Sequence, residues 1–139
     1  MKKFLLPFLA LLAIPASVNA GYTSDVDLMT DETKIRITHD SITKVSNSIG
    51  VQEPASIVIR CDFKNDKTIN LDAYIKTPTY NTDNNKVGLR WDSGEPIRTS
   101  WNESTSGTAL FNPNPKKFIN KLLESNTLVF QWTPYQSVP

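Results

Sequence analysis

The stretch from Ile57 to Ile75 shows a clear alternation of apolar and polar residues. Odd-numbered positions from Ile57 to Phe63 carry apolar side chains or the cysteine, and Arg60 is one of the polar residues between them. The same alternation returns after the four polar residues 64–67. A period of two predicts strands with one buried face, and a polar break of this length predicts a hairpin turn. The chain is therefore expected to build an antiparallel sheet.

Shorter segments with the same pattern predict the remaining strands. They lie at residues 34–39, 87–91, 97–101, 108–111 and 127–133. The turn at 92–96 contains Gly94, which is free to adopt a positive φ. Residues 43–54 and 77–86 are rich in Asn, Ser, Thr and Asp, so they are predicted to be loops.

One segment has helical periodicity. Asn114 is a suitable N-cap, and Pro115 fits the first helical position because its missing N–H is not needed there. Apolar residues then share one face, and Asn126 is expected to end the helix, since asparagine can tolerate a left-handed conformation. The predicted fold is α+β, mainly β: an antiparallel sheet or small β-sandwich of about six to seven strands with one amphipathic helix at 114–125.

Residues 1–20 are predicted to be a cleavable secretory signal peptide. Two lysines give a positive start, an apolar stretch follows, and cleavage is expected between Ala20 and Gly21. The apolar stretch is shorter than the about 20 residues that cross a bilayer. We therefore expect export to the periplasm, a single β-rich domain at 21–139, and no membrane span in the mature chain.

Charge and composition limit the cofactors and partners. The chain has 15 Lys and Arg against 14 Asp and Glu, a formal net charge of +1. Because this charge is small and no basic stripe accompanies the aromatic residues, nucleic acid is not an expected partner. One Cys and one His exclude an intrachain disulfide and a closed Cys/His zinc site. No cofactor and no bound metal are predicted.

His39 and Cys61 are the side chains with the most obvious catalytic potential. His39 precedes Asp40, but adjacent strand residues point to opposite faces, so an exposed histidine at a strand end is favoured. Cys61 shares the inward parity of its strand, which favours a small buried hydrophobe over a nucleophile. A third interpretation is an intermolecular or lost disulfide, since free thiols are unusual in an oxidising compartment. No catalytic residue is predicted.

Two acidic clusters and the aromatic residues allow other sites. Asp25–Glu32 and Asp62–Asp66 are candidates for weak calcium binding, but neither matches the EF-hand loop, so solvated turns are favoured. Trp91 and Trp101 share a parity in paired strands and are expected to lie close together. They are candidates for a sugar- or peptide-stacking platform, although core packing is the favoured interpretation.

Several short motifs occur in a fixed order along the chain. Asp27, Met29 and Asp31 lie in a D-x-M-T-D segment, and Ile57–Cys61 is followed by Asn65–Thr68. Further members of the set are Arg90, Asp92, Gly94, Trp101 and Ser104, then residues 109–111, Phe118, Leu122 and Leu123, and residues 128–130 and 133–135. This ordered set resembles the VasI/TagO-like family of exported proteins associated with type VI secretion, which also occur as stand-alone or prophage-borne domains.

The resemblance implies a non-enzymatic accessory protein that binds another envelope protein. Family members continue beyond the T-P-Y block into another strand and a helix that ends near a second cysteine. The resemblance therefore implies that this chain is truncated at its C-terminus or completed by a partner. Association through an unpaired strand edge, or a dimer linked through Cys61, stays open. Two other functions stay open: a prophage-encoded envelope factor, for instance in superinfection exclusion, and a small cell-wall hydrolase.

Overall fold

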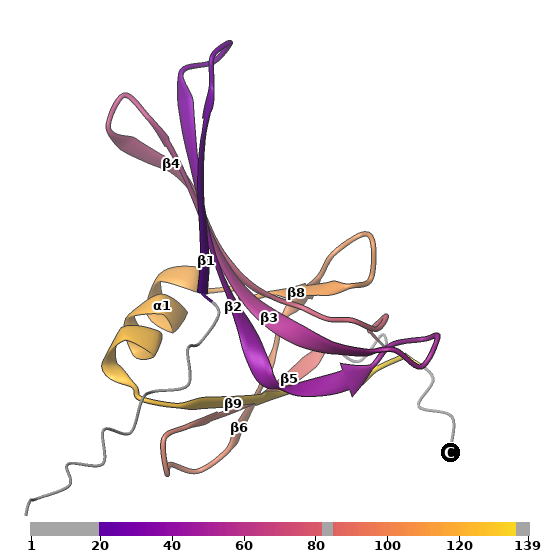
Figure 1. Ribbon diagram of the computed structural model, residues 1–139. Coiled ribbons are helices and arrows are strands. Elements are labelled where there is room, and N and C mark those ends of the chain that lie inside the picture. The colour runs from indigo at the N-terminus through magenta and orange to yellow at the C-terminus, as the bar shows by residue number, and fades with distance from the viewer. Residues whose placement is uncertain (1–19, 82–84, 136–139) are drawn as a thin grey trace, which may run out of the picture.

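The computed structural model describes residues 20–81 and 85–135, which form two antiparallel sheets and one helix (Figure 1). The predicted α+β class, mainly β, is confirmed. The predicted signal peptide lies outside the described residues except for Ala20. The elements are β1 Ala20–Asp27, β2 Glu32–Ser46, β3 Gln52–Lys64, β4 Lys67–Lys76, β5 Lys86–Trp91, β6 Ile97–Ser100, β7 Asn102–Glu103, β8 Ala109–Phe111, α1 Pro115–Glu124 and β9 Leu128–Gln131.

The larger sheet has the strand order β1-β2-β3-β4-β8-β7, and the smaller sheet has the order β6-β5-β9. The predicted central hairpin is β3–β4, in which Ile57 lies opposite Ile75. Its two turn residues, Asn65 and Asp66, have φ values of 48° and 59°. Positive φ at both central positions is the type I′ geometry, whose twist matches that of the flanking strands.

The structure contains more strand than the sequence predicts. β1 is an additional edge strand, and the predicted loop at 43–54 is wrong because β2 extends to Ser46 and β3 begins at Gln52. A change of register between Asp40 and Lys44 breaks the alternation in β2. At this irregularity the Ser41 hydroxyl accepts the Ala55 N–H at 3.1 Å, so a side chain replaces a backbone partner.

Helix α1 begins as predicted and ends differently. The Asn114 side chain accepts the Lys117 N–H at 3.2 Å, and Pro115 is the first helical residue. The C-cap is Ser125 in an extended conformation, with φ of −109° and ψ of 149°. The helix therefore ends before Asn126, the residue predicted to end it, and Asn126 is not among the described residues with positive φ.

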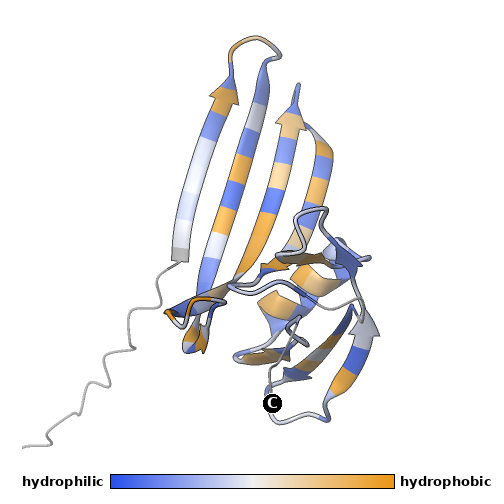
Figure 2. Ribbon diagram, turned by 90° about the vertical axis from the view of Figure 1, so that its right-hand side faces the viewer, coloured by the Kyte–Doolittle hydropathy of each residue, from blue (hydrophilic) through white to orange (hydrophobic). Residues whose placement is uncertain are grey.

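The core lies where α1 and the smaller sheet pack against one face of the larger sheet. Trp101, Ile75, Leu110 and Val87 are the largest fully buried side chains, and Phe118 of α1 packs among them. The hairpins β1–β2 and β3–β4 extend well beyond this core (Figure 1, Figure 2). Figure 2 shows the alternation of apolar and polar residues along β2, β3 and β4 of these hairpins. The smaller layer therefore covers only part of the larger one.

Candidate binding groove

An apolar groove lies between β9 and the larger sheet and has a volume of about 640 Å³. The side chains of Ile37, Ile57 and Ile59 share the sheet face that forms its floor, as the pairing of β2 with β3 shows. On the other side it is lined by β9, Trp132 and the end of α1. Among the residues that the structure describes, Asp40 is the one carboxylate that lines the groove, and neither Lys nor Arg lines it. The groove is therefore suited to apolar, uncharged groups.

Strand β9 is the edge of the smaller sheet, because β5 pairs with one side of it and no described strand pairs with the other. The Asp92 N–H donates to the Thr127 carbonyl at 3.0 Å, so the backbone of Thr127 faces β5. Backbone direction alternates along an antiparallel strand. The N–H and C=O groups of Leu128 and Phe130 therefore point away from β5, along the open edge.

This edge has none of the features that usually protect an exposed strand. Residues 126–133 contain no charged residue, proline or glycine. Natural edge strands commonly carry charges, prolines or bulges that prevent pairing with another chain. Strand β2, on the opposite side of the groove, has such an irregularity at residues 41–43. Pairing with an added strand is therefore expected at β9 rather than at β2.

The motif residues Arg90, Asp92 and Gly94 come together in the turn that positions β9. Asp92 Oδ1 accepts the N–H groups of Asn126 and Thr127 at 2.8 and 2.9 Å, and these bonds lower the pKa of the Asp92 carboxyl. Arg90 Nε donates to the Gly94 carbonyl at 3.1 Å. The sequence allows a positive φ at Gly94, but in the structure the residue of this turn with a positive φ is Asp92, at 49°. Gly94 has another role, since a Cβ there would lie 3.1 Å from the Trp91 carbonyl oxygen.

The motif residues Asp27, Met29 and Asp31 form the turn between β1 and β2, at the end of the projecting sheet. The Asp27 carboxylate accepts the Met29 N–H at 2.9 Å, and this bond is the main cause that lowers the pKa of Asp27. Asp31 has a φ of 54°, and the Met29 side chain is exposed. These residues lie on a solvated turn and do not line the groove. Among residues 20–81 and 85–135, no group of three or more His, Cys, Asp or Glu is placed to hold a metal ion.

Cys61 lies on the apolar face of the larger sheet, in the part that projects beyond α1. Its neighbours across the strands are Ile35 and Leu71. The sequence predicts a buried thiol, but the structure leaves it half-buried. No described element covers this part of the face. Partial burial raises the pKa of the Cys61 thiol, and a hydrogen bond with the Thr68 side chain offsets part of this rise. A raised pKa makes the thiol a weak nucleophile at neutral pH.

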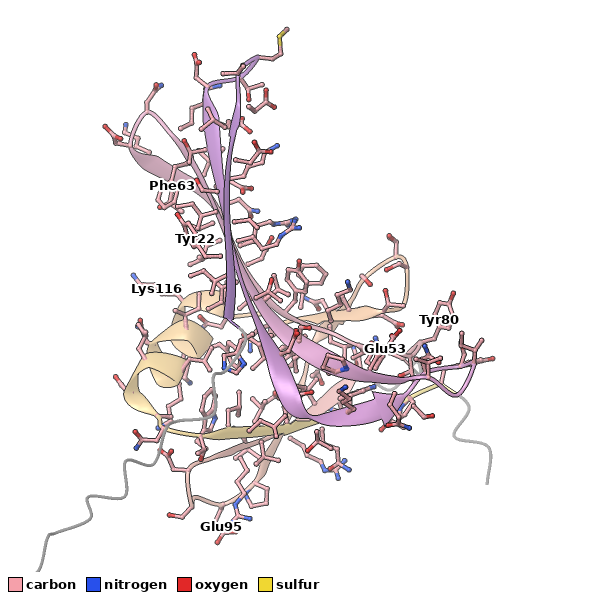
Figure 3. All side chains as sticks on the ribbon, viewed as in Figure 1. Tyr22, Glu53, Phe63, Tyr80, Glu95 and Lys116 are labelled. Atoms are coloured by element: carbon pink, nitrogen blue, oxygen red, sulfur yellow. The ribbon has the colours of Figure 1, made fainter. Side chains whose placement is uncertain are left out.

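The two faces of the projecting sheet differ sharply in charge. Figure 3 shows Phe63 and Tyr22 on the side of α1, with Lys116 of the helix below them. The opposite face carries an ion pair between Arg60 and Asp72, which raises the pKa of Arg60. On that face the Asn70 amide also donates to Asp62 and Asp72, at 3.2 and 3.1 Å. The apolar face continues from this projecting region into the floor of the groove.

The candidate aromatic residues and His39 lie in two places, the hydrophobic core and the groove. Trp101 is 1% exposed and meets the Phe118 ring edge-on at 5.2 Å, which confirms core packing for this residue. Trp91 meets the same ring at 5.5 Å and also lines the groove. The register of β5 with β6 places Trp91 and Trp101 at opposite ends of that strand pair, so they meet through Phe118 and not by direct strand pairing as predicted. His39 is exposed as predicted, but it lies within β2 rather than at a strand end, and it lines the groove.

Comparison with known proteins gives no match to a family model, to a curated protein or to a solved structure. The resemblance to VasI/TagO-like proteins therefore stays a prediction from the motifs. Within the described part of the chain, no helix has the length and apolar character needed to cross a membrane.

Proposed function

We propose that this chain is an exported, non-enzymatic binding protein of the periplasm. Its binding site is the groove between β9 and the larger sheet, and its partner is another protein of the bacterial envelope. The observation that supports this most directly is the open, uncharged edge of β9 at the wall of an apolar groove. Exposed edges without protection favour association with another polypeptide.

The energetics of the groove favour reversible binding. A fully buried Val, Leu, Ile or Phe side chain contributes about 1.5–3 kcal/mol. Three such side chains from a partner would contribute roughly 5–9 kcal/mol, and the loss of translational and rotational freedom opposes this by several kcal/mol. Backbone hydrogen bonds along β9 add to the total. We therefore expect weak, reversible binding, with a dissociation constant in the high micromolar range or above.

The cellular context of the proposal comes from the sequence. The predicted signal peptide supports export, and the motif order supports an accessory role like that of type VI secretion-associated VasI/TagO-like proteins. In this chain two of the motifs are turns that shape the scaffold, and the turn containing Asp92 positions the edge of the groove. The motif that contains Asp92 therefore supports the binding surface, whereas the turn of Asp27, Met29 and Asp31 shapes the projecting end of the larger sheet.

The experiment compares the capture of envelope proteins by three forms of the mature chain. In Ile37→Lys a charge enters the floor of the groove, at a position that is 41% exposed and tolerates a long side chain. Leu28→Lys is the matched control, since Leu28 is 88% exposed and does not line the groove. Thermal unfolding checks that all three forms fold.

We expect the wild type and the control to capture the same envelope protein, identified by mass spectrometry. The groove variant should retain at least about tenfold less of it, because the lysine would lose its hydration when an apolar partner fills the groove. Equal capture by the wild type and the groove variant, or no capture by any form, would contradict the proposed function.

A further inference from the structure

We propose that the groove receives an extended, uncharged strand of the partner, which pairs with β9 and becomes a fourth strand of the smaller sheet. This inference rests on the proposed function and specifies the chemistry of its partner. Three features of the groove carry it: the unequal widths of the two sheets, the direction of the β9 backbone, and the charges of the lining residues.

The unequal layers leave room for one more strand. The larger sheet has six described strands and the smaller has three, with β9 at its edge. The apolar side chains of Ile37, Ile57 and Ile59 line the groove beside that edge. A strand added to β9 would lie over these side chains, as stacked sheets do at about 10 Å separation.

The backbone of β9 requires a polypeptide as its partner. The outward N–H and C=O groups of Leu128 and Phe130 alternate as donor and acceptor along the edge. An extended peptide supplies matching groups at the same spacing, whereas a lipid chain supplies none. The irregularity in β2 at residues 41–43 makes the other side of the groove a poor edge for pairing. The added strand therefore pairs with β9.

The lining residues define the side chains of that strand. Of the described lining residues, Asp40 carries the one carboxylate, and its Oδ1 already accepts the Ser56 hydroxyl at 2.6 Å. No lysine or arginine of residues 20–81 and 85–135 lines the groove, so an acidic segment would find no lysine or arginine counter-charge from these residues. The matching segment is uncharged and places apolar side chains at alternate positions, towards Ile37, Ile57 and Ile59. We expect this segment to be about six to eight residues long, so that it covers the whole of β9 and extends past both of its ends.

The test uses terminally blocked peptides of about eight residues in which valine alternates with threonine. One analogue is N-methylated at the valines and the other at the threonines, so each loses the N–H donors of one edge and keeps every side chain. A strand that pairs with β9 uses one edge only. Trp91 and Trp132 line the groove, so tryptophan emission reports binding of peptides that contain no tryptophan.

We expect one analogue to bind with a dissociation constant in the high micromolar range or above, and the other at least about tenfold more weakly. The Ile37→Lys variant should no longer bind the better analogue, whereas the Leu28→Lys variant should bind it with the affinity of the wild type. Equal binding of both analogues and of a peptide N-methylated at every residue would show that backbone pairing is not used and would overturn the inference. Failure of both would also overturn it, while groove-dependent capture of an envelope protein would leave the proposed function intact.

A further outcome concerns the identity of the occupant. A chain that sediments as a dimer and becomes monomeric when the peptide binds would place a second copy in the groove, and this would overturn the assignment to a partner protein. A monomer whose emission changes with only one analogue supports the inference as stated.

Discussion

The Asp92 carboxylate accepts the N–H of Thr127 at 2.9 Å, although 35 positions separate the two residues. This bond connects the turn after β5 to the residue just before β9. The same oxygen accepts the Asn126 N–H, so one carboxylate satisfies two consecutive backbone donors after α1. The end of the helix and the start of the open edge are therefore positioned by one side chain. Loss of this carboxylate should affect both stability and the groove.

Replacement of Asp92 should produce a stability loss that depends on pH. The folded-state pKa of Asp92 lies below its ordinary value of 3.8, mainly because of the bonds from Thr127 and Asn126. Its stabilising effect is therefore complete above the unfolded pKa and is lost as the pH falls through the lowered folded value. Urea unfolding should show Asp92→Ala to be less stable than the wild type at pH 7, with a smaller gap at acid pH.

Asp92→Asn is the matched control for this experiment. Asparagine keeps an acceptor oxygen and tolerates the positive φ at this position, but it does not titrate. Its stability should be closer to that of the wild type at pH 7, and the remaining difference should vanish in acid. A gap between wild type and Asp92→Asn that stays constant with pH would contradict the role assigned to the carboxylate.

Cys61 should react slowly with maleimides in the native protein. The thiol is half-buried among apolar residues, and this raises its pKa above the ordinary value of 9.0. Less thiolate is therefore present at neutral pH than in the unfolded chain. The alkylation rate, followed by mass spectrometry, should be lower in the native chain than in urea and should keep rising beyond pH 9. A native rate equal to the rate in urea would contradict this prediction.

The local elements follow from the sequence, whereas the groove does not. Hairpin β3–β4 and the start of α1 are predictable because alternation, turn residues and the Asn114–Pro115 cap are adjacent in the chain. β1 shows no such pattern, since Gly21–Val26 are exposed throughout and impose no period of two. The groove brings together Ile37 and Phe130 from opposite ends of the domain. No local pattern encodes a contact of that kind.

The N-cap of α1 can be tested by an alanine substitution. The Asn114 side chain accepts the Lys117 N–H, so Asn114→Ala should cost about 1 kcal/mol in the free energy of unfolding. Asn120 is exposed within the same helix, and Asn120→Ala should leave stability unchanged or raise it by up to about 0.7 kcal/mol, because alanine is the better helix former. Urea denaturation measures both variants. Equal effects of the two substitutions would show that the cap does not stabilise the helix.

A lysine on β9 should reduce aggregation without unfolding the domain. Val129 is 62% exposed, and an edge-strand lysine discourages pairing with another chain. Val129→Lys should therefore lengthen the lag before light scattering rises during warming, with the unfolding temperature unchanged. Val26→Lys is the matched control. Val26 is 53% exposed on β1, the edge strand of the larger sheet, where Asp25 and Asp27 already supply charge. It should have a smaller effect. If both variants delayed aggregation equally, β9 would not be the edge through which copies associate.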